Sequence, residues 1–177
     1  MSQVVVETTS VALLEPSTEA LLTAGGSATQ FVFDMPGGAR CPGDSASGGY
    51  RVQGFMLPST TPLSNVHFST SGPSSGLPLF AMGSPLIDHN TAMNTGVVVG
   101  LPAFDFRVLA EANVAPGSYV VGIACTQHGR PTTAWQGTID LSADASDQPA
   151  HLRWTVEPTA MGKTASGATA TSAASSS

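Results

Sequence analysis

The part of this 177-residue chain whose residue types come nearest to a catalytic nucleophile is Gly43-Asp44-Ser45-Ala46-Ser47-Gly48-Gly49. A serine set between an acid and glycines can attack a carbonyl if a histidine takes its proton and backbone amides hold the oxyanion. The four histidines of the chain all follow that serine: His67, His89, His128 and His151. A general base for Ser45 would therefore have to come from a later part of the chain.

Around Ser45 the string resembles the Gly-Asp-Ser-Gly-Gly loop of trypsin-like proteases, with two residues inserted after the serine. The insertion displaces the amides of the oxyanion hole, because those donors must lie directly beside the nucleophile. Those proteases also supply their histidine and aspartate upstream of the serine, whereas no histidine precedes Ser45. We therefore expect a glycine- and serine-rich turn between two strands, no catalytic residue and no enzyme.

The remaining polar residues do not form a pattern for a metal or a cofactor. No histidine lies two or four positions from another histidine or a cysteine, as ligands on one strand or helix face would. Asp144 and Asp147 share a turn, but a calcium loop would need further oxygen ligands at alternate positions. No glycine-rich loop opens a helix to cradle a phosphate. The sequence therefore predicts no metal site and no cofactor.

Four residues are candidates for contact with a partner. Asp88, His89 and Asn90 lie within residues 57–99, a stretch rich in proline, serine and glycine that we expect to form a long loop excursion at one end of the fold. A turn-forming role for these three residues is the simpler interpretation, and binding of a metal ion or a sugar is the alternative. Phe55 falls on the polar face of its predicted strand, so it becomes a contact residue if no other part of the fold covers it.

Cys41 and Cys125 are the only cysteines, and each lies beside a strand-like segment. They can form a disulfide, remain two buried thiols or provide half of a metal site. The disulfide is favoured over the metal site because neither cysteine has a second ligand at a suitable spacing. A disulfide persists only in an oxidising compartment.

The start of the chain bears on how it would reach such a compartment. Met1-Ser2-Gln3 carries no basic region, and the apolar stretches after it are too short for the core of a secretion signal. We therefore expect either that a signal was removed or that the protein leaves the cell by another route, such as lysis that releases a virus particle.

Composition excludes two classes of partner. Charged residues make up 10% of the chain, and 12 acidic against 6 basic residues give a formal net charge of −6. The arginines are scattered singly, so no basic stripe exists to follow a phosphate backbone. No apolar run approaches the roughly 18 residues that cross a bilayer. We therefore expect neither nucleic-acid binding nor a membrane span.

The elements that must position these residues are strands. From residue 30 to residue 157, apolar side chains recur with a period of two, as in half-buried strands. The predicted strands cover residues 50–57, 104–108, 119–125, 135–141 and 152–156. Proline and glycine clusters separate them, and no segment has a convincing amphipathic helical pattern. We expect an all-β fold, an antiparallel β-sandwich of two sheets packed face to face.

The two ends of the chain differ from this central region. Residues 1–29 contain a β-rich piece and a segment broken at Pro16, and we predict an N-terminal arm or edge strand. Residues 30–157 form the predicted sandwich. Residues 158–177 are dominated by alanine, serine, threonine and glycine. We predict a flexible tail there, because this composition cannot bury enough apolar surface to offset the entropy of ordering.

Five segments carry a resemblance to known proteins: Cys41-Pro42-Gly43-Asp44, Gly49 to Met56, Pro102 to Phe106, Pro116 to Tyr119, and Gly122 to Thr126. Over roughly residues 30–141 the chain resembles secreted or surface proteins of high-GC Gram-positive bacteria, and virion proteins of actinobacterial phages as well. The resemblance implies an immunoglobulin-like β-sandwich with a paired cysteine. It transfers no activity.

These observations lead to one hypothesis of function and one alternative. We expect a non-enzymatic structural or interaction protein, a capsid-decoration or tail component exposed on the surface of a phage virion. The alternative is a secreted or cell-surface immunoglobulin-like module of an actinobacterium that binds a protein or a glycan. The expected partners are other virion or surface proteins, and a homo-oligomer could form by strand pairing at a sheet edge.

Overall fold

The computed structural model describes residues 5–157, and it confirms the all-β fold class. Only two α-helices occur in this part of the chain, α1 (Ser45–Gly48) and α2 (Leu109–Ala112), and each is about one turn long. No helix between residues 5 and 157 is long and apolar enough to cross a membrane. The predicted flexible tail, residues 158–177, lies outside the described residues.

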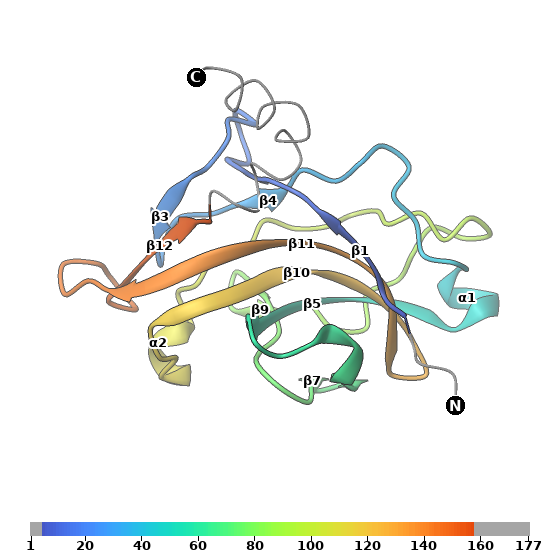
Figure 1. Cartoon of the computed structure of the whole chain (residues 1–177). Coiled ribbons are helices and arrows are strands. Elements are labelled where there is room, and N and C mark those ends of the chain that lie inside the picture. Colours follow the sequence, from blue (N-terminus) through green and yellow to red (C-terminus); the bar gives the residue numbers. More distant parts are fainter. Residues whose placement is uncertain (1–4, 158–177) are drawn as a thin grey trace, which may run out of the picture.

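One six-stranded sheet forms the larger layer of the fold (Figure 1). Its strands, in order across the sheet, are β3 (Ala24–Gly26), β12 (Leu152–Val156), β11 (Arg130–Ala143), β10 (Gly117–Gln127) and β5 (Tyr50–Pro58). The sixth strand, β1 (Glu7–Ser10), pairs with β11 in parallel, whereas the other neighbours are antiparallel. The strands predicted from residue 50, 119, 135 and 152 onward are therefore present, and the N-terminal segment supplies an edge strand.

The β10–β11 hairpin is the centre of this sheet because it buries side chains on both faces. In β10, Val121 and Ile123 belong to the main core, whereas Ala124 belongs to a second cluster on the opposite face. In β11, Trp135 and Ala134 divide between the two faces in the same way. Apolar residues at successive positions are what such a doubly covered strand requires.

Short ribbons joined by single β-bridges form the second layer. β2 (Leu13–Leu14) pairs with β4 (Val32–Phe33), and β8 (Phe80–Ala81) pairs with β9 (Ser84–Pro85). A bridge between Phe31 and Phe104 and another between Phe80 and Asp105 connect the two ribbons. The two layers agree with a β-sandwich in its coarse form, while the immunoglobulin-like arrangement stays a prediction.

The predicted strand at residues 104–108 is wrong beyond Asp105, where the chain turns and enters α2. Phe104 and Phe106 are both buried, so the alternating pattern predicts the buried side chains correctly. The pattern does not predict strand pairing here, because a bent segment can also direct alternate side chains into a core. Asp105, between them, is buried as well, and its carboxylate accepts a hydrogen bond from the Arg107 N–H (3.1 Å).

Aromatic side chains fill the space between the two layers. The Phe31 ring lies 5.7 Å from Phe33, 5.2 Å from Phe106 and 5.8 Å from Trp154, measured between centroids. Edge-on and tilted contacts of this kind add to the stabilisation that comes from burying large apolar side chains. Trp154 and Trp135 are both buried in this core.

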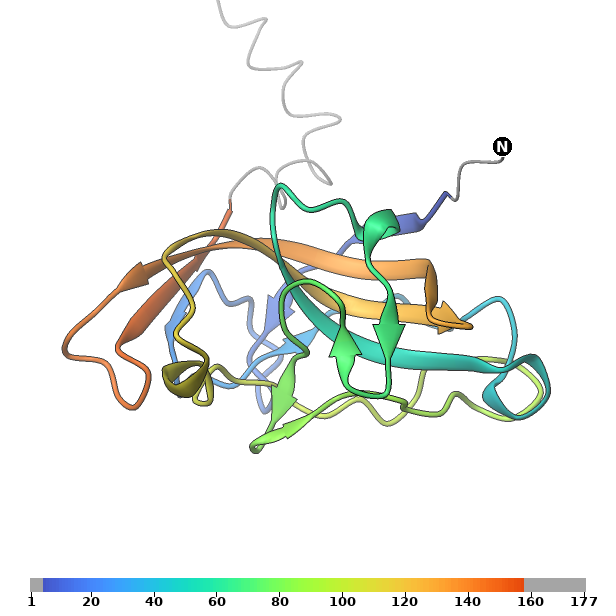
Figure 2. The ribbon, with the colours of Figure 1, turned by 90° about the horizontal axis from the view of Figure 1, so that it is seen from below.

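The opposite face of the sheet is partly covered by the start of the loop excursion. This covering contains η1 (Leu63–Asn65), β6 (Phe68–Ser69) and β7 (Gly72–Pro73). In Figure 2 the turn near residue 65 lies above the long strands, whereas the light-green β8–β9 hairpin lies below them. The long excursion therefore contributes to both layers rather than standing apart from the fold.

A disulfide between Cys41 and Cys125 links β10 to the segment that precedes α1. Both cysteines are buried in the main core, with Cα atoms 5.5 Å apart. The Cys41 N–H also donates to the Gly96 carbonyl (2.8 Å), which ties the same segment to the loop excursion. The bond joins positions 84 residues apart, so it constrains a large part of the chain.

Removing this disulfide should destabilise the fold strongly. The chain-entropy model gives about 4 to 5 kcal/mol for a closed loop of this length. We expect a Cys41→Ala/Cys125→Ala double variant to lose about 3 to 5 kcal/mol in the free energy of unfolding, measured by urea denaturation against the oxidised protein. Alkylation of the folded protein should label neither cysteine, and a labelled Cys125 would contradict the pairing.

Gly122 in β10 lets two neighbours approach its backbone closely. A Cβ atom at this position would lie 2.5 Å from the Trp135 carbonyl oxygen and 2.8 Å from Cζ of Phe55. We expect Gly122→Ala to lower the free energy of unfolding by about 1 to 3 kcal/mol, because both neighbours are held inside the fold. Gly37→Ala is the matched control, since nothing lies within 4 Å of an added Cβ there. Equal losses in urea denaturation of the two variants would argue against the close approach.

Candidate functional site

The string that resembles a nucleophile loop forms a capped turn. Asp44 is the N-cap of α1, and its Oδ1 accepts hydrogen bonds from the Ser47 N–H (2.8 Å), the Ser47 hydroxyl (2.7 Å) and the Gly48 N–H (3.1 Å). Its Oδ2 accepts from the Asn94 N–H (2.6 Å). The Ser47 hydroxyl, then the backbone amides of Ser47, Asn94 and Gly48, hold the pKa of Asp44 far below its ordinary value. The carboxylate therefore joins α1 to the loop that contains Asn94.

Ser45 is paired with a threonine instead of a histidine. The Thr91 N–H donates to the Ser45 hydroxyl oxygen (2.9 Å), and the Ser45 N–H donates to Thr91 Oγ1 (3.0 Å). This reciprocal pair is buried, and it fixes the side chain against the chain segment around residue 91. The arrangement gives Ser45 a role in holding two loops together.

A polar cleft opens beside α1, and we call it the Arg51 cleft. Its volume is about 290 Å³, and its lining residues are Ser45, Ala46, Arg51, Asn90, Thr91 and Met93. Arg51 Nε forms an ion pair with Asp88 (2.9 Å), and Arg51 Nη1 donates to the Ser45 carbonyl (3.2 Å) and to Asn90 Oδ1 (3.4 Å). The guanidinium is half-exposed, so it can also reach a bound partner.

The structure separates the predicted contact residues from one another. Asp88 and Asn90 both meet Arg51 at the cleft. His89 points elsewhere, since its Nε2 lies 2.7 Å from the Val99 carbonyl oxygen. Its backbone pairs with Val52 of β5, so His89 extends the sheet.

Phe55 was a wrong choice as a contact residue. Its side chain is 0% exposed, and its ring packs against Phe68 with centroids 6.3 Å apart. The loop excursion covers the face of β5 on which Phe55 lies. A strand pattern cannot reveal this, because the covering residues come from a separate part of the chain.

Met93 is a member of the cleft that the sequence prediction missed. Its side chain is 71% exposed, in a turn followed by Asn94, Thr95 and Gly96. A methionine in an otherwise polar turn is an available sequence signal, since this flexible side chain adapts to irregular apolar contacts. The Arg51 cleft thus combines a guanidinium, an amide and an exposed apolar group.

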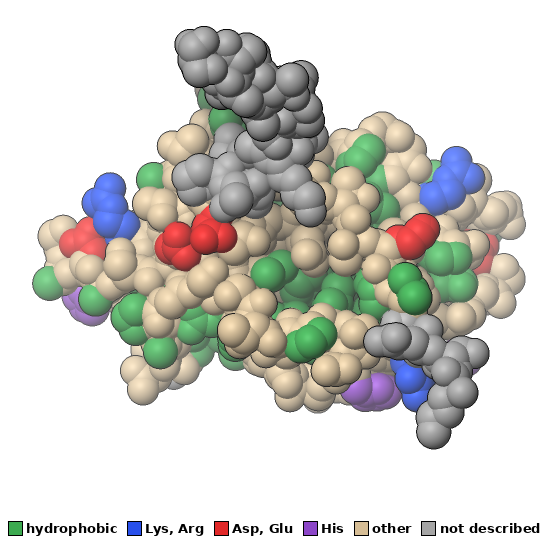
Figure 3. All heavy atoms as spheres, viewed as in Figure 1, with side chains coloured by type: hydrophobic (Ala, Val, Ile, Leu, Met, Phe, Trp, Pro, Cys, Tyr) green, Lys and Arg blue, Asp and Glu red, His purple; other side chains and the backbone are tan. Residues whose placement is uncertain are grey.

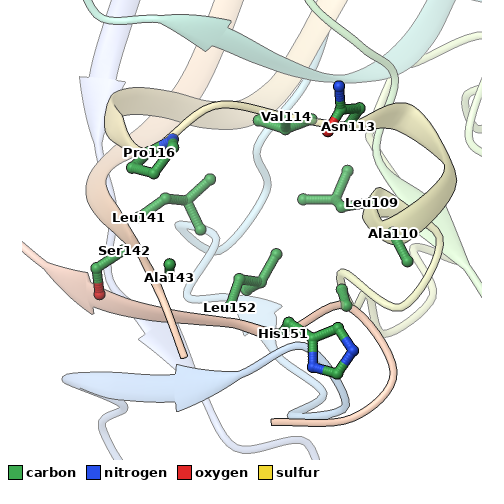
Figure 4. A pocket seen from close by; sticks show the side chains of 11 residues that line it. Leu109, Ala110, Asn113, Val114, Pro116, Leu141, Ser142, Ala143, His151 and Leu152 are labelled. Carbon is green, nitrogen blue, oxygen red and sulfur yellow. The ribbon is translucent and has the colours of Figure 1, made fainter. Parts of the chain in front are cut away.

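A second cavity, of about 130 Å³, lies between α2 and the ends of β11 and β12. Figure 4 shows Leu109, Leu141 and Leu152 directed toward its interior and His151 at its rim. His151 is exposed and lies directly before β12. The walls are chiefly aliphatic and bring no set of acids, bases or nucleophiles together.

The acids with a calcium-like spacing stabilise a turn. Asp147 accepts hydrogen bonds from the Ser27 N–H and hydroxyl and from the Leu152 N–H. Asp144 accepts from the Ser146 hydroxyl and N–H, which lowers its pKa, and it lies 3.7 Å from Arg153. Among residues 5–157 no group of three or more histidine, cysteine, aspartate or glutamate side chains is placed to hold a metal ion.

The face of the molecule seen in Figure 3 carries few charged side chains, and most of it is uncharged surface. Comparisons with protein-family models, with curated proteins and with solved structures found no match to this chain. The function proposed below therefore follows from the residues of the chain itself.

The Asp44 cap should make stability depend on pH. Because its pKa is lowered in the folded protein from the ordinary 3.8, the cap contributes stability above that value, and the contribution is lost as the pH falls below it. We expect Asp44→Asn to have a lower urea midpoint than the wild type near neutral pH, and the difference between the two midpoints to shrink progressively as the pH falls below 3.8. Glu15 and Asp144 stay unchanged in both proteins, so the difference isolates Asp44. If the difference in urea midpoint between the wild type and Asp44→Asn does not change with pH, the charge of Asp44 does not stabilise the fold.

Proposed function

We propose that this chain is a non-enzymatic structural or interaction protein, a capsid-decoration or tail component exposed on the surface of a phage virion. The observation that carries the proposal is the buried Cys41–Cys125 disulfide. A bond of this kind persists outside the reducing cytosol. A particle released by lysis offers that environment.

The Arg51 cleft supports a protein as the partner. Arginine and methionine are enriched in protein interfaces, whereas lysine and glutamate are depleted. Arg51 and Asn90 supply hydrogen-bonding groups, and the exposed Met93 supplies an adaptable apolar contact. We propose that Asp88 and Asn90 act at this surface together with Arg51.

A secreted or cell-surface module that binds a protein or a glycan is the second candidate. The same disulfide favours it, because the exterior of a cell is also oxidising. The fold does not separate the two candidates, since one scaffold can carry many binding sites.

Mass spectrometry of gradient-purified virions tests the first candidate. We expect peptides of this chain in the particle fraction at a constant ratio to a major capsid or tail protein. Peptides confined to the culture medium or the cell wall would instead favour the second candidate.

Rebinding of the purified protein to particles that lack it tests whether the Arg51 cleft is the contact surface. We expect Met93→Glu to weaken rebinding by at least about tenfold, because a charge would replace an apolar interface contact. Met82→Glu is the matched control, since Met82 is 85% exposed at the tip of the β8–β9 hairpin, away from the cleft. Equal losses in the two variants would exclude the Arg51 cleft as the contact surface.

A further inference from the structure

We propose that β1 is the surface at which two copies of this chain pair edge to edge, as an antiparallel dimer. The starting observation is that β1 lies at an edge of the sheet, and that its outer side has no backbone partner within residues 5–157. The outer edge of β5 hydrogen-bonds to residues 77–89, as in the two bonds between Met56 and Leu77 (2.8 and 2.9 Å). At β3 the cover is partial: the outward Gly26 N–H donates to the Thr29 hydroxyl (2.9 Å). β1 has no comparable cover within residues 5–157.

The backbone of β1 offers hydrogen-bonding groups on its outer side. The Val11 N–H donates to the Gln136 carbonyl of β11 (2.9 Å). Since backbone groups of successive strand residues point to opposite edges, those of Glu7 and Thr9 face β11, whereas those of Thr8 and Ser10 face outward. All four side chains of β1 are exposed, and its one ladder partner among the described strands is β11 (Figure 1).

β1 lacks three of the features with which natural edge strands avoid pairing, namely lysine, proline and a bulge. Its sequence is Glu-Thr-Thr-Ser, and its register with β11 is regular over all four residues. Threonine also favours the extended backbone that an added strand requires. The short length of β1 and the charge of Glu7 oppose pairing, which is one reason why the dimer is weak.

A second copy of β1 fits this edge in a register that can be derived. Side chains opposed across an antiparallel pair lie on the same face of the sheet, so residues can oppose each other only when their numbers differ by an even amount. With Thr8 on the two-fold axis, it opposes Thr8 of the second copy, and Glu7 opposes Thr9. Cross-strand threonine pairs are favourable, and no two carboxylates are directly opposed.

Size and charge set the strength of the dimer. Two four-residue strands bury much less than the roughly 1,200 Å² typical of a stable interface. Each copy carries a formal charge of −6, and salt screens the repulsion between copies. We therefore infer a weak dimer that strengthens with salt and that becomes populated where copies are held close together, as on a particle.

Sedimentation equilibrium of the full chain tests the proposal. We expect a reversible dimer at about 0.1 to 1 mM protein, with a lower dissociation constant at higher salt. Thr8→Pro removes an outward N–H and leaves the residues that bond to β11 in place, so it should weaken dimerisation by at least about tenfold. Thr8→Ala keeps the N–H and serves as the matched control, with an expected change within about threefold.

Hydrogen exchange of the wild type gives a second readout that needs no variant. The Thr8 and Ser10 amides should exchange more slowly at high protein concentration, whereas the Thr9 amide should be equally protected at low and high concentration. A wild type that stays monomeric at about 1 mM in high salt would overturn the proposal. So would a dimer that Thr8→Pro leaves unchanged, or concentration-dependent protection at a different strand. None of these outcomes bears on whether the chain belongs to a virion.

Discussion

The rest of the structure depends on covering both faces of the β10–β11 hairpin. Val121 and Trp135 require an apolar layer on one side, and Ala124 and Ala134 require one on the other. Residues 5–157 contain no second regular sheet that could cover the face of Val121 and Trp135. Short ribbons and the bridge between Phe31 and Phe104 cover that face instead. The loop excursion covers the face of Ala124 and Ala134, and it places Phe68 over β5.

This constraint explains why so much irregular chain is well packed. Loops usually lie at the surface because their backbone groups need partners. Here the partners are provided by single bridges and by side chains, such as the Asp44 carboxylate that accepts from Asn94 and the Ser45–Thr91 pair. The Cys41–Cys125 disulfide adds a covalent tie between the central strand and the same region. The Arg51 cleft is thus built from loops that are fixed at several points, as a binding surface requires.

The nucleophile-like string shows how residue types with catalytic potential can serve structure. Its acid caps a helical turn, and its serine exchanges hydrogen bonds with a threonine. Asp144 and Asp147 likewise satisfy nearby donors in a turn. Asp44 and Asp144 accept hydrogen bonds from amides a few residues ahead of them, which is the preferred use of aspartate at caps and turns. Ser45 and Asp147 also bond to amides of distant segments, those of Thr91 and Ser27.

The sequence alone was sufficient for the fold class, the main strands and the choice of the disulfide among three alternatives. These features follow from a local rule, the period of two along a strand, and from the absence of metal ligands near the cysteines. The rule failed at residues 106–108, because a bent chain can bury alternate side chains without pairing. Only the tertiary structure decided that Phe55 is covered, that β1 runs parallel to β11, and that Asp88 and Asn90 meet Arg51 while His89 does not. Each of those facts depends on which distant segments pack together, and a periodic pattern within one segment contains no information about its neighbours in space.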